Sequence, residues 1–230
     1  MLAFVVSGGE LKEPRRFEPF ARAADLTLAA DSGYDHMLLM GVRPDVLMGD
    51  LDSISSAALE DARQGRIAIS TFPQEKDYTD TELVLREALD RGADTILSCG
   101  AFGMRLDHLL ANVLLLASPV FRGVDLRLLD EEQEVRLVRG RLELVTVPGE
   151  TISLIPVGGQ AMGVTTSGLY YPLSAATLET GPALGISNVA TGPRASVEVA
   201  DGLVLLTRIF AGGLDAARYL VDNPPTQAQV

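Results

Sequence analysis

The sequence predicts an α/β fold in its N-terminal half and a β-rich fold in its C-terminal half. Up to about residue 130, short apolar runs alternate with amphipathic segments, a pattern typical of a mostly parallel sheet covered by helices. After Gly140, Val and Thr become more frequent and glycine or proline recurs about every eight to twelve residues, which indicates short antiparallel strands. We therefore expect an N-terminal α/β/α domain over residues 1–135, a C-terminal antiparallel β-sandwich or barrel-like domain over residues 140–215, and a tail over residues 216–230.

The strands of the N-terminal domain are expected to be short and buried. Each is rich in apolar residues and is closed by Gly, Asp or Ser, the residues that commonly follow a strand end. These segments are residues 2–6, 26–30, 46–48, 67–70, 95–98 and 124–129.

Helices are predicted between these strands. The clearest begins at Thr79, where Thr79 and Glu82 form a capping-box pattern ahead of apolar residues at helical spacing, and it ends near Gly92. A second helix is expected over residues 106–117, before Pro119. Because it is apolar on nearly every face, we expect it to be buried between other elements.

In the C-terminal half, alternating apolar and polar residues predict strands over residues 151–155 and 196–199. Asp201 and Gly202 form a typical turn pair, so we expect them to make a hairpin turn before a strand over residues 203–206. The segment from Asn223 has no pattern that would form a core.

Composition excludes several classes of partner. Acidic residues outnumber basic ones 31 to 19, a net charge of −12, so a broad nucleic-acid surface is not expected. The longest apolar stretch, residues 109–120, is interrupted by polar residues and falls short of the roughly 20 residues that a membrane span needs. A single cysteine, Cys99, permits no internal disulfide and agrees with a cytoplasmic location.

Two aspartates directly follow the predicted strand at residues 46–48. Asp50 and Asp52 are two positions apart, so in an extended segment both carboxylates point to the same side. The carboxyl end of a strand is where open α/β sheets bind ligands. An alternative is that Asp52 or Ser53 only caps a helix that begins near Ser55.

A second acidic group follows the strand at residues 67–70. Lys76 and Asp77 precede the helix that begins at Thr79, and Asp80 lies in its first turn. Stabilisation of the helix dipole would by itself explain an acidic residue there. If both groups meet at one sheet edge, each pair of carboxylates at ~4 Å repels by about 4 kcal/mol at an effective dielectric constant of 20. Such a cluster needs a cation, and oxygen-only ligation suits Mg²⁺.

The segment after the strand at residues 95–98 contains further polar residues at the same edge. Its glycines permit close backbone approach, Arg105 offers several donors to a phosphate, and Asp107 and Asn112 lie on the following helix. Asp31 follows the strand at residues 26–30 in the same way. Because no Walker-type loop or dinucleotide motif is present, phosphate binding depends on a carboxylate-held metal with Lys76 and Arg105.

These motifs resemble a known family. The N-terminal half is similar to the catalytic domain of the thiamine pyrophosphokinase family in residues 31–33, GDLDS at 49–53, KDYTDTEL at 76–83 and GAFGMRLDHLLAN at 100–112. The C-terminal half is similar to the thiamine-binding domain of that family at residues 153–156, 163–169, 171–173 and 185–188. The resemblance covers roughly residues 4–207.

The resemblance implies an enzyme that transfers the pyrophosphoryl group of ATP to the hydroxyl of thiamine, giving thiamine diphosphate and AMP. It also implies Mg²⁺ and a homodimer whose active site lies at the subunit interface. The implied residues match the family by position. The implied catalytic residues are Asp50, Asp52, Asp77, Asp80 and Arg105, and the four aspartates are also the implied metal ligands. The implied ATP-binding residues are Asp31, Lys76, Thr79, Arg105, Asp107 and Asn112. The implied thiamine-binding residues are Ser187 and Asn188.

Some residues depart from the family pattern. Ser32, Met104 and Val189 stand where the family commonly has Gly, Gly and Glu, and the chain has no Trp, so thiamine must pack on Tyr, Phe or aliphatic side chains. The general base is left open, with an aspartate of the acidic cluster as one candidate. Three other readings stay open from the residues alone: a glycosyltransferase with a DxD metal site, a pyrophosphokinase for another hydroxymethyl heterocycle such as a pterin, and a thiamine-binding sensor.

Overall fold

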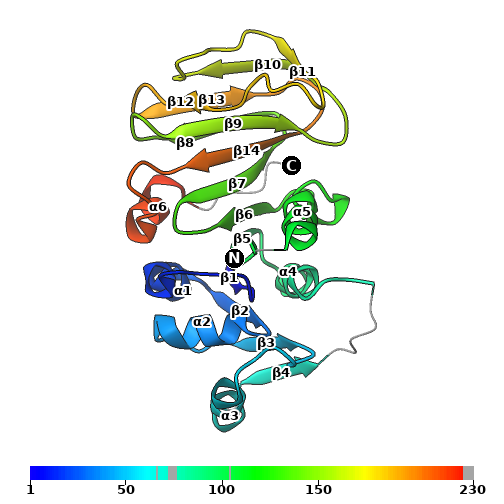
Figure 1. Ribbon diagram of the computed structural model, residues 1–230, viewed down its shortest axis with the longest axis vertical. Coiled ribbons are helices and arrows are strands. Elements are labelled where there is room, and N and C mark those ends of the chain that lie inside the picture. Colours follow the sequence, from blue (N-terminus) through cyan, green and yellow to red (C-terminus); the bar gives the residue numbers. More distant parts are fainter. Residues whose placement is uncertain (66, 72–76, 104, 225–230) are drawn as a thin grey trace. The chain divides into compact units, whose positions relative to one another are not determined.

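The computed structural model describes residues 1–65, 67–71, 77–103 and 105–224. The chain divides into two compact units. Unit 1 contains Met1–Glu131 and Asp215–Leu220, and unit 2 contains Glu132–Leu214 and Val221–Asn223. Figure 1 shows the helices and strands, coloured from the N-terminus in blue to the C-terminus in red.

Unit 1 is built on a parallel sheet. Its strands are β1 (Leu2–Val6), β2 (Leu26–Ala30), β3 (Val46–Gly49), β4 (Ala68–Thr71), β5 (Thr95–Cys99) and β6 (Asp125–Leu129). Their order is β6-β5-β1-β2-β3-β4, and every pair between neighbours is parallel. The predicted mostly parallel sheet is therefore confirmed. From β1 the chain adds β2, β3 and β4 in turn on one side of β1, and then β5 and β6 on the other side. The strand order therefore reverses between β1 and β5.

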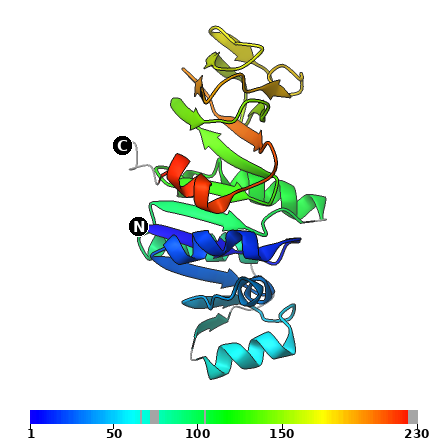
Figure 2. The ribbon, with the colours of Figure 1, turned by 90° about the vertical axis from the view of Figure 1, so that its left-hand side faces the viewer.

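Helices lie on both faces of this sheet, with α1 (Glu18–Ala23) and α2 (Gly33–Met40) on one face and α4 (Asp80–Asp90) and α5 (Leu106–Leu115) on the other (Figures 1 and 2). Thr79 caps α4 as predicted, because its side chain accepts a hydrogen bond from the backbone N–H of Glu82 at 3.1 Å. The helical elements are η1 (Pro14–Phe17), α1 (Glu18–Ala23), α2 (Gly33–Met40), α3 (Ser56–Gln64), α4 (Asp80–Asp90), α5 (Leu106–Leu115), η2 (Pro119–Phe121) and α6 (Ala216–Asp222). None of the helices in the described ranges is long and apolar enough to span a bilayer.

The prediction that the helix after residue 105 is buried on nearly all sides is wrong. In α5, Leu106, Leu110 and Leu114 are 68%, 50% and 51% exposed. These residues are four apart and so share one helix face. The opposite face carries the buried Asn112. A helix that packs on only one side leaves its other face in solvent, and composition alone does not distinguish this from burial on both sides.

Unit 2 is an antiparallel β-sandwich, which agrees with the predicted C-terminal fold. One sheet has the order β12-β9-β14-β7 and the other β11-β10-β13-β8. Buried side chains of both sheets form one core, with Leu154 and Leu206 from the first sheet and Val164 and Val197 from the second. The strands are β7 (Gln133–Val138), β8 (Arg141–Val145), β9 (Thr151–Pro156), β10 (Ala161–Ser167), β11 (Ala176–Leu178), β12 (Asn188–Val189), β13 (Arg194–Glu198) and β14 (Val204–Ile209).

The predicted hairpin at Asp201 and Gly202 is wrong. The strands on either side, β13 and β14, belong to different sheets, since β13 pairs with β8 and β10 whereas β14 pairs with β7 and β9. The turn therefore carries the chain across the sandwich. Gly202 is needed there because its φ is 92° and a Cβ would lie 2.6 Å from the carbonyl oxygen of Gln160. Each of the two strands has one face in the shared core, so apolar and polar residues alternate in both, as they would in the two strands of a hairpin.

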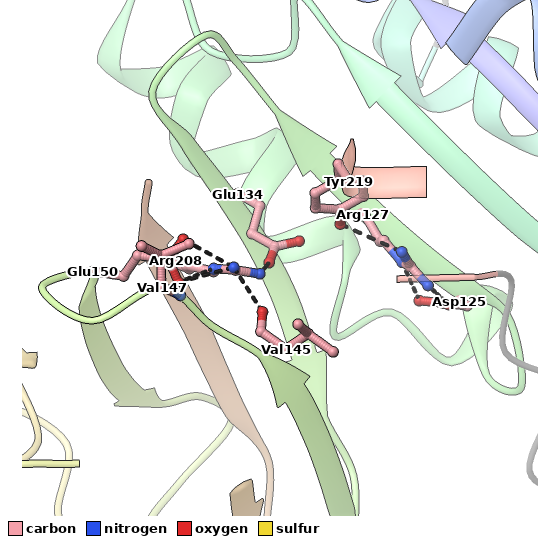
Figure 3. A network of polar contacts seen from close by, with 8 residues as sticks. All are labelled: Asp125, Arg127, Glu134, Val145, Val147, Glu150, Arg208 and Tyr219. Atoms are coloured by element: carbon pink, nitrogen blue, oxygen red, sulfur yellow. Dashed lines mark hydrogen bonds and ion pairs between the residues drawn. The ribbon is translucent and has the colours of Figure 1, made fainter. Parts of the chain in front are cut away.

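The segment after residue 215 forms α6, which packs in unit 1 through its first turns. Tyr219 meets the ring of Phe20 edge to face with centroids 5.6 Å apart. Its hydroxyl accepts a hydrogen bond of 3.4 Å from Arg127, a fully buried residue of β6 that also pairs with Asp125 (Figure 3). Arg127 donates as well to the carbonyl of Pro224 at 3.2 Å. A buried guanidinium thus ties the C-terminal helix to the parallel sheet.

Candidate active site

The candidate site of unit 1 lies at the carboxyl edge of the parallel sheet. All strands of this sheet run the same way, so the residues that follow β1, β2, β3 and β5 reach the same edge. At the point where the strand order reverses, backbone hydrogen bonds continue past β1 and β5. Ser7 donates to Cys99 at 2.9 Å and Gly9 donates to Gly100 at 2.8 Å. Ligands of open α/β sheets bind at such a reversal.

Glycines at this edge allow the backbones to approach closely. A Cβ on Gly33, the first residue of α2, would lie 2.1 Å from the carbonyl oxygen of Val6, and one on Gly100 would lie 2.1 Å from that of Ser7. These glycines therefore let α2 and the segment after β5 pack directly against the end of β1. His36 of α2 contacts the carbonyl oxygen of Gly9 through its Nε2 at 2.8 Å, which is a structural contact.

The acidic loop, residues 49–55, follows β3 and carries Asp50 and Asp52. Its first part is held by the buried Asp31, whose Oδ1 accepts a hydrogen bond of 3.0 Å from the backbone N–H of Leu51. A side chain at Gly49 is excluded, because its Cβ would lie 1.8 Å from the Asp31 carboxylate. The N–H of Asp52 donates to Asp50 Oδ1 at 3.1 Å, so a hydrogen bond within the acidic loop also joins its two aspartates.

The far end of the acidic loop is held by Asp35 of α2. Ser55 donates to this carboxylate through both its hydroxyl and its backbone N–H, the latter at 3.1 Å. The same hydroxyl accepts from the N–H of Ala58 and so caps α3. Sequence reasoning missed Asp35, since an acidic residue in the first turn of a helix is common and only the fold brings it to Ser55.

The second acidic motif leads into α4. Asp77 is exposed, Thr79 caps the helix, and Asp80 is its first residue. The hydroxyl of Thr81 donates to Ser7 Oγ at 3.1 Å, which brings the start of α4 next to the end of β1. Lys76, expected to contact phosphate, lies outside the described residues.

The acidic residues have the right chemistry for Mg²⁺, because every proposed ligand is a carboxylate. Within residues 1–65, 67–71, 77–103 and 105–224, however, no group of at least three His, Cys, Asp or Glu side chains lies close enough together to hold a metal ion. The acidic loop and the start of α4 thus lie at the edge of one sheet, but their described carboxylates do not converge on one point.

Arg105 and Asp107 form an exposed pair at the start of α5. Two hydrogen bonds, the shorter 2.6 Å, join the guanidinium to the carboxylate. The hydrogen bond and the opposite charge raise the pKa of Arg105 and lower that of Asp107, so both groups are charged at neutral pH. With side chains 70% and 65% exposed, they are accessible to a ligand from solvent.

Asn112 is buried instead. Its Nδ2 donates to the carbonyl oxygen of Ala101 at 2.8 Å, which fixes the glycine-containing segment after β5. Its Oδ1 is buried and has no hydrogen-bond partner among the residues that the structure describes. The side chain that the resemblance assigns to ATP binding thus also supports the loop that carries Arg105.

In unit 2, Asn188 uses its side-chain amide to hold Tyr171. Its Oδ1 accepts from the backbone N–H groups of Tyr171 and Val189 at 3.0 and 2.9 Å, and its Nδ2 donates to the carbonyl of Tyr171 at 2.6 Å. The neighbouring Ser187 is exposed and has a left-handed φ of 57°. Its N–H donates to Ser153 Oγ at 2.9 Å, so its own hydroxyl is presented on a fixed backbone.

The segment that Asn188 holds carries two exposed aromatic rings. Tyr170 and Tyr171 are 66% and 65% exposed and meet edge to face with centroids 4.8 Å apart. Neighbouring aromatic side chains in solvent commonly mark a binding surface. The motif at residues 171–173 pointed to this segment, whereas the ring pair became apparent only in the structure.

Comparisons with known proteins agree on one family for both halves of the chain. Residues 17–128 match the family model "Thiamin pyrophosphokinase, catalytic domain", and residues 139–204 match "Thiamin pyrophosphokinase, vitamin B1 binding domain". Thiamine pyrophosphokinase from Bacillus subtilis is 28% identical over 89% of this chain and 96% of its own length. Thiamine pyrophosphokinase 1 from Arabidopsis thaliana is 28% identical over 86% of this chain and 84% of its own length.

Solved structures give the same result. The crystal structure of thiamine pyrophosphokinase from Bacillus subtilis superposes with a TM-score of 0.80 at 26% identity, covering 91% of this chain and 99% of that one. The yeast thiamin pyrophosphokinase structure superposes with a TM-score of 0.77 at 18% identity and supports the fold.

Proposed function

The chain belongs to the thiamin pyrophosphokinase family, and we propose that it transfers the pyrophosphoryl group of ATP to the hydroxyl of thiamine, giving thiamine diphosphate and AMP. The observation that carries this proposal is the match of both halves of the chain, in order, to the catalytic and the vitamin B1 binding domains. A DxD glycosyltransferase or a pyrophosphokinase for another heterocycle does not account for the second match, and a thiamine-binding sensor does not account for the first.

In this proposal, residues 1–135 bind ATP and residues 140–215 bind thiamine. The ATP side uses Asp31, Lys76, Thr79, Arg105, Asp107 and Asn112. The thiamine side uses Ser187 and Asn188. The geometry of Asn188 supports an indirect role, because its amide already holds the backbone of Tyr171.

Asp50, Asp52, Asp77 and Asp80 would hold Mg²⁺. A bound ion would neutralise phosphate charge there. The chain's own residues position the reactants. The acidic loop is held at both ends, by Asp31 and by Asp35, which limits how far its carboxylates can move.

The reaction is attack by the hydroxyl of thiamine on the β-phosphorus of ATP, with AMP as the leaving group. Positioning and charge neutralisation supply most of the rate in phosphoryl transfer. The exposed guanidinium of Arg105 can offset charge on the leaving group, as can Lys76. An aspartate of the acidic motifs is the candidate for the group that accepts the hydroxyl proton.

We also propose that the protein works in the cytoplasm as a homodimer with its active site at the subunit interface. The family resemblance supports the dimer, and the lone buried thiol of Cys99 agrees with a reducing compartment. Sedimentation of the active protein tests the dimer, and a fully active monomer would contradict it.

The reaction is tested by incubating the pure protein with ATP, Mg²⁺ and thiamine and detecting products by mass spectrometry. We expect AMP and thiamine diphosphate in equal amounts and neither after chelation. Asp80→Asn should lower turnover on the order of a hundredfold, because positioned charge contributes that much in comparable sites. Asp90→Asn, at the other end of α4, is the matched control and should keep full activity. AMP without thiamine diphosphate would contradict the assigned acceptor.

A further inference from the structure

A buried arginine of unit 2 holds the connection between β8 and β9. Arg208 of β14 is 5% exposed, and its Nε and Nη2 each donate to the carboxylate of Glu150 at 2.9 Å (Figure 3). Its Nη2 also donates to the carbonyl of Val145 at 2.8 Å, and its Nη1 donates to Glu134 at 3.3 Å. The guanidinium therefore joins β14 and β7 to the connection between β8 and β9.

Glu150 transfers this restraint to the backbone. Its carboxylate, 3% exposed, accepts a further hydrogen bond of 3.0 Å from the N–H of Val147, and its own N–H donates to the carbonyl of Val147 at 3.1 Å. The turn at residues 147–150 is thus closed by the same side chain that the arginine holds. A bidentate pair in a buried setting restricts both orientation and distance.

The turn at residues 147–150 pairs with the chain that follows β12. Gly149 donates to the carbonyl of Ala190 at 2.9 Å, and Ala190 donates to the carbonyl of Glu150 at 2.9 Å. In register with these bonds, Val189 lies opposite Thr151 and Asn188 opposite Ile152. The bonds to this turn therefore extend the pairing of the two-residue strand β12 with β9.

On its other side, β12 holds the exposed tyrosines. The N–H of Tyr170 donates to the carbonyl of Val189 at 2.9 Å, and Asn188 clamps the backbone of Tyr171. Successive contacts therefore run from Arg208 through Glu150 and Ala190 to Asn188 and Tyr171. Each is a hydrogen bond or a peptide link within unit 2.

We infer that Arg208 and Glu150 are positioning residues for thiamine binding, which hold Ser187, Asn188 and Tyr171 in place through the turn at residues 147–150. Neither side chain is exposed enough to touch the substrate. The inference rests on the proposed function, since it assigns the Ser187 region to thiamine.

Arg208→Lys and Glu150→Gln test this role, with Arg141→Lys as the matched control. Lysine keeps the charge of Arg208 but cannot form the two parallel hydrogen bonds. Glutamine keeps the shape of Glu150 and one acceptor oxygen. Arg141 also pairs with two glutamates in unit 2, but its side chain is 59% exposed.

We expect both variants to raise the KM for thiamine on the order of tenfold and to change the KM for ATP by less than about twofold, because misplacement of binding groups acts on the substrate that they contact. Hydrogen exchange should become faster at the amides of Ala190 and Thr191 in both variants and not in Arg141→Lys. Arg208→Lys should have the larger effect.

An unchanged KM for thiamine in both variants, with an active wild-type protein, would overturn this inference and leave the proposed function standing. A proportional rise of both Michaelis constants would also overturn it, because the effect would then not be selective for thiamine. If Arg208→Lys does not fold, Glu150→Gln alone decides. A wild-type protein that forms no thiamine diphosphate would instead overturn the proposed function.

Discussion

The buried carboxylate of Asp31 accepts a hydrogen bond of 3.0 Å from the backbone N–H of Leu51, and both residues have left-handed φ angles, 46° and 64°. Such angles are uncommon outside glycine, although Asp and Asn tolerate them better than most residues. The contact joins the end of β2 to the acidic loop after β3. Asp31 therefore shapes the loop that carries Asp50 and Asp52.

Replacing Asp31 separates its geometry from its charge. Asp31→Ala removes the hydrogen bond and places alanine at a left-handed angle, so we expect the free energy of unfolding to fall by about 2–4 kcal/mol. Asp31→Asn keeps an acceptor oxygen and tolerates the angle, so it should lose about 1 kcal/mol or less. Urea denaturation of the two variants measures this difference. Equal losses in both would contradict the role of the hydrogen bond.

Gly33 and Gly41, at opposite ends of α2, form a second comparison. A Cβ at Gly33 would lie 2.1 Å from the carbonyl oxygen of Val6, so Gly33→Ala must push α2 away from β1. Gly41 has a φ of 78° but nothing within 4 Å of a Cβ, so Gly41→Ala costs only the left-handed angle, about 1 kcal/mol.

We expect Gly33→Ala to be the more destabilising of the two by a large margin and to lower pyrophosphoryl transfer, whereas Gly41→Ala should keep full activity. Thermal melting and product formation measure both effects. A Gly33→Ala protein as stable as Gly41→Ala would show that the contact between α2 and β1 can relax.

Acid should destabilise unit 1 partly through Asp61. Hydrogen bonds from Arg43, in two places, and from the buried Tyr34 lower the pKa of Asp61 to about 2. The unfolded value is about 3.9. Because the folded pKa is the lower one, this contribution to stability is fully present above about pH 4 and is lost as the pH falls toward 2.

Asp61→Asn lacks this titration. We expect its melting temperature to be lower than that of the wild type at pH 7, and the difference to shrink as the pH falls from 4 to 2. Calorimetry across this range measures it. A constant difference between the two proteins at all pH values would show that the ionised form of Asp61 has no special role.

The buried guanidinium of Arg127 should be important for stability. Arg127→Leu breaks the ion pair with Asp125 and removes the contacts to Tyr219 and Pro224, so we expect a loss of about 3–5 kcal/mol, typical of breaking a buried pair. Arg122→Leu, at an exposed position of the preceding connection, should change stability by about 0.5 kcal/mol or less. Chemical denaturation measures both, and similar values would contradict the role of the buried pair.

The strands of unit 1 were predictable because each is a short, continuous apolar run between residues that stop strands. Residues 2–6 and 26–30 match β1 and β2 at both ends, and the other predicted strands differ by single residues at their ends. The cap at Thr79 was predictable for the same reason, since the hydrogen bond of a helix cap involves residues three apart.

Pairing between distant residues was not predictable. Asp35 holds Ser55, and Arg208 holds Glu150, through contacts between residues 20 and 58 positions apart. No local pattern marks these residues. The turn at Asp201 and Gly202 was recognised as a turn, but whether it returns the chain to the same sheet depends on which strands pair.

The element types, the change from an α/β half to a β half, and the family could all be predicted from the sequence, because they depend on local periodicity and on motifs of neighbouring residues. The exposed face of α5, the hydrogen bonds between Asn188 and Tyr171, and the contacts of Asp31 and Asp35 with the acidic loop became known from the folded structure. These contacts form only when strands far apart in the sequence pair and bring their ends to a common edge.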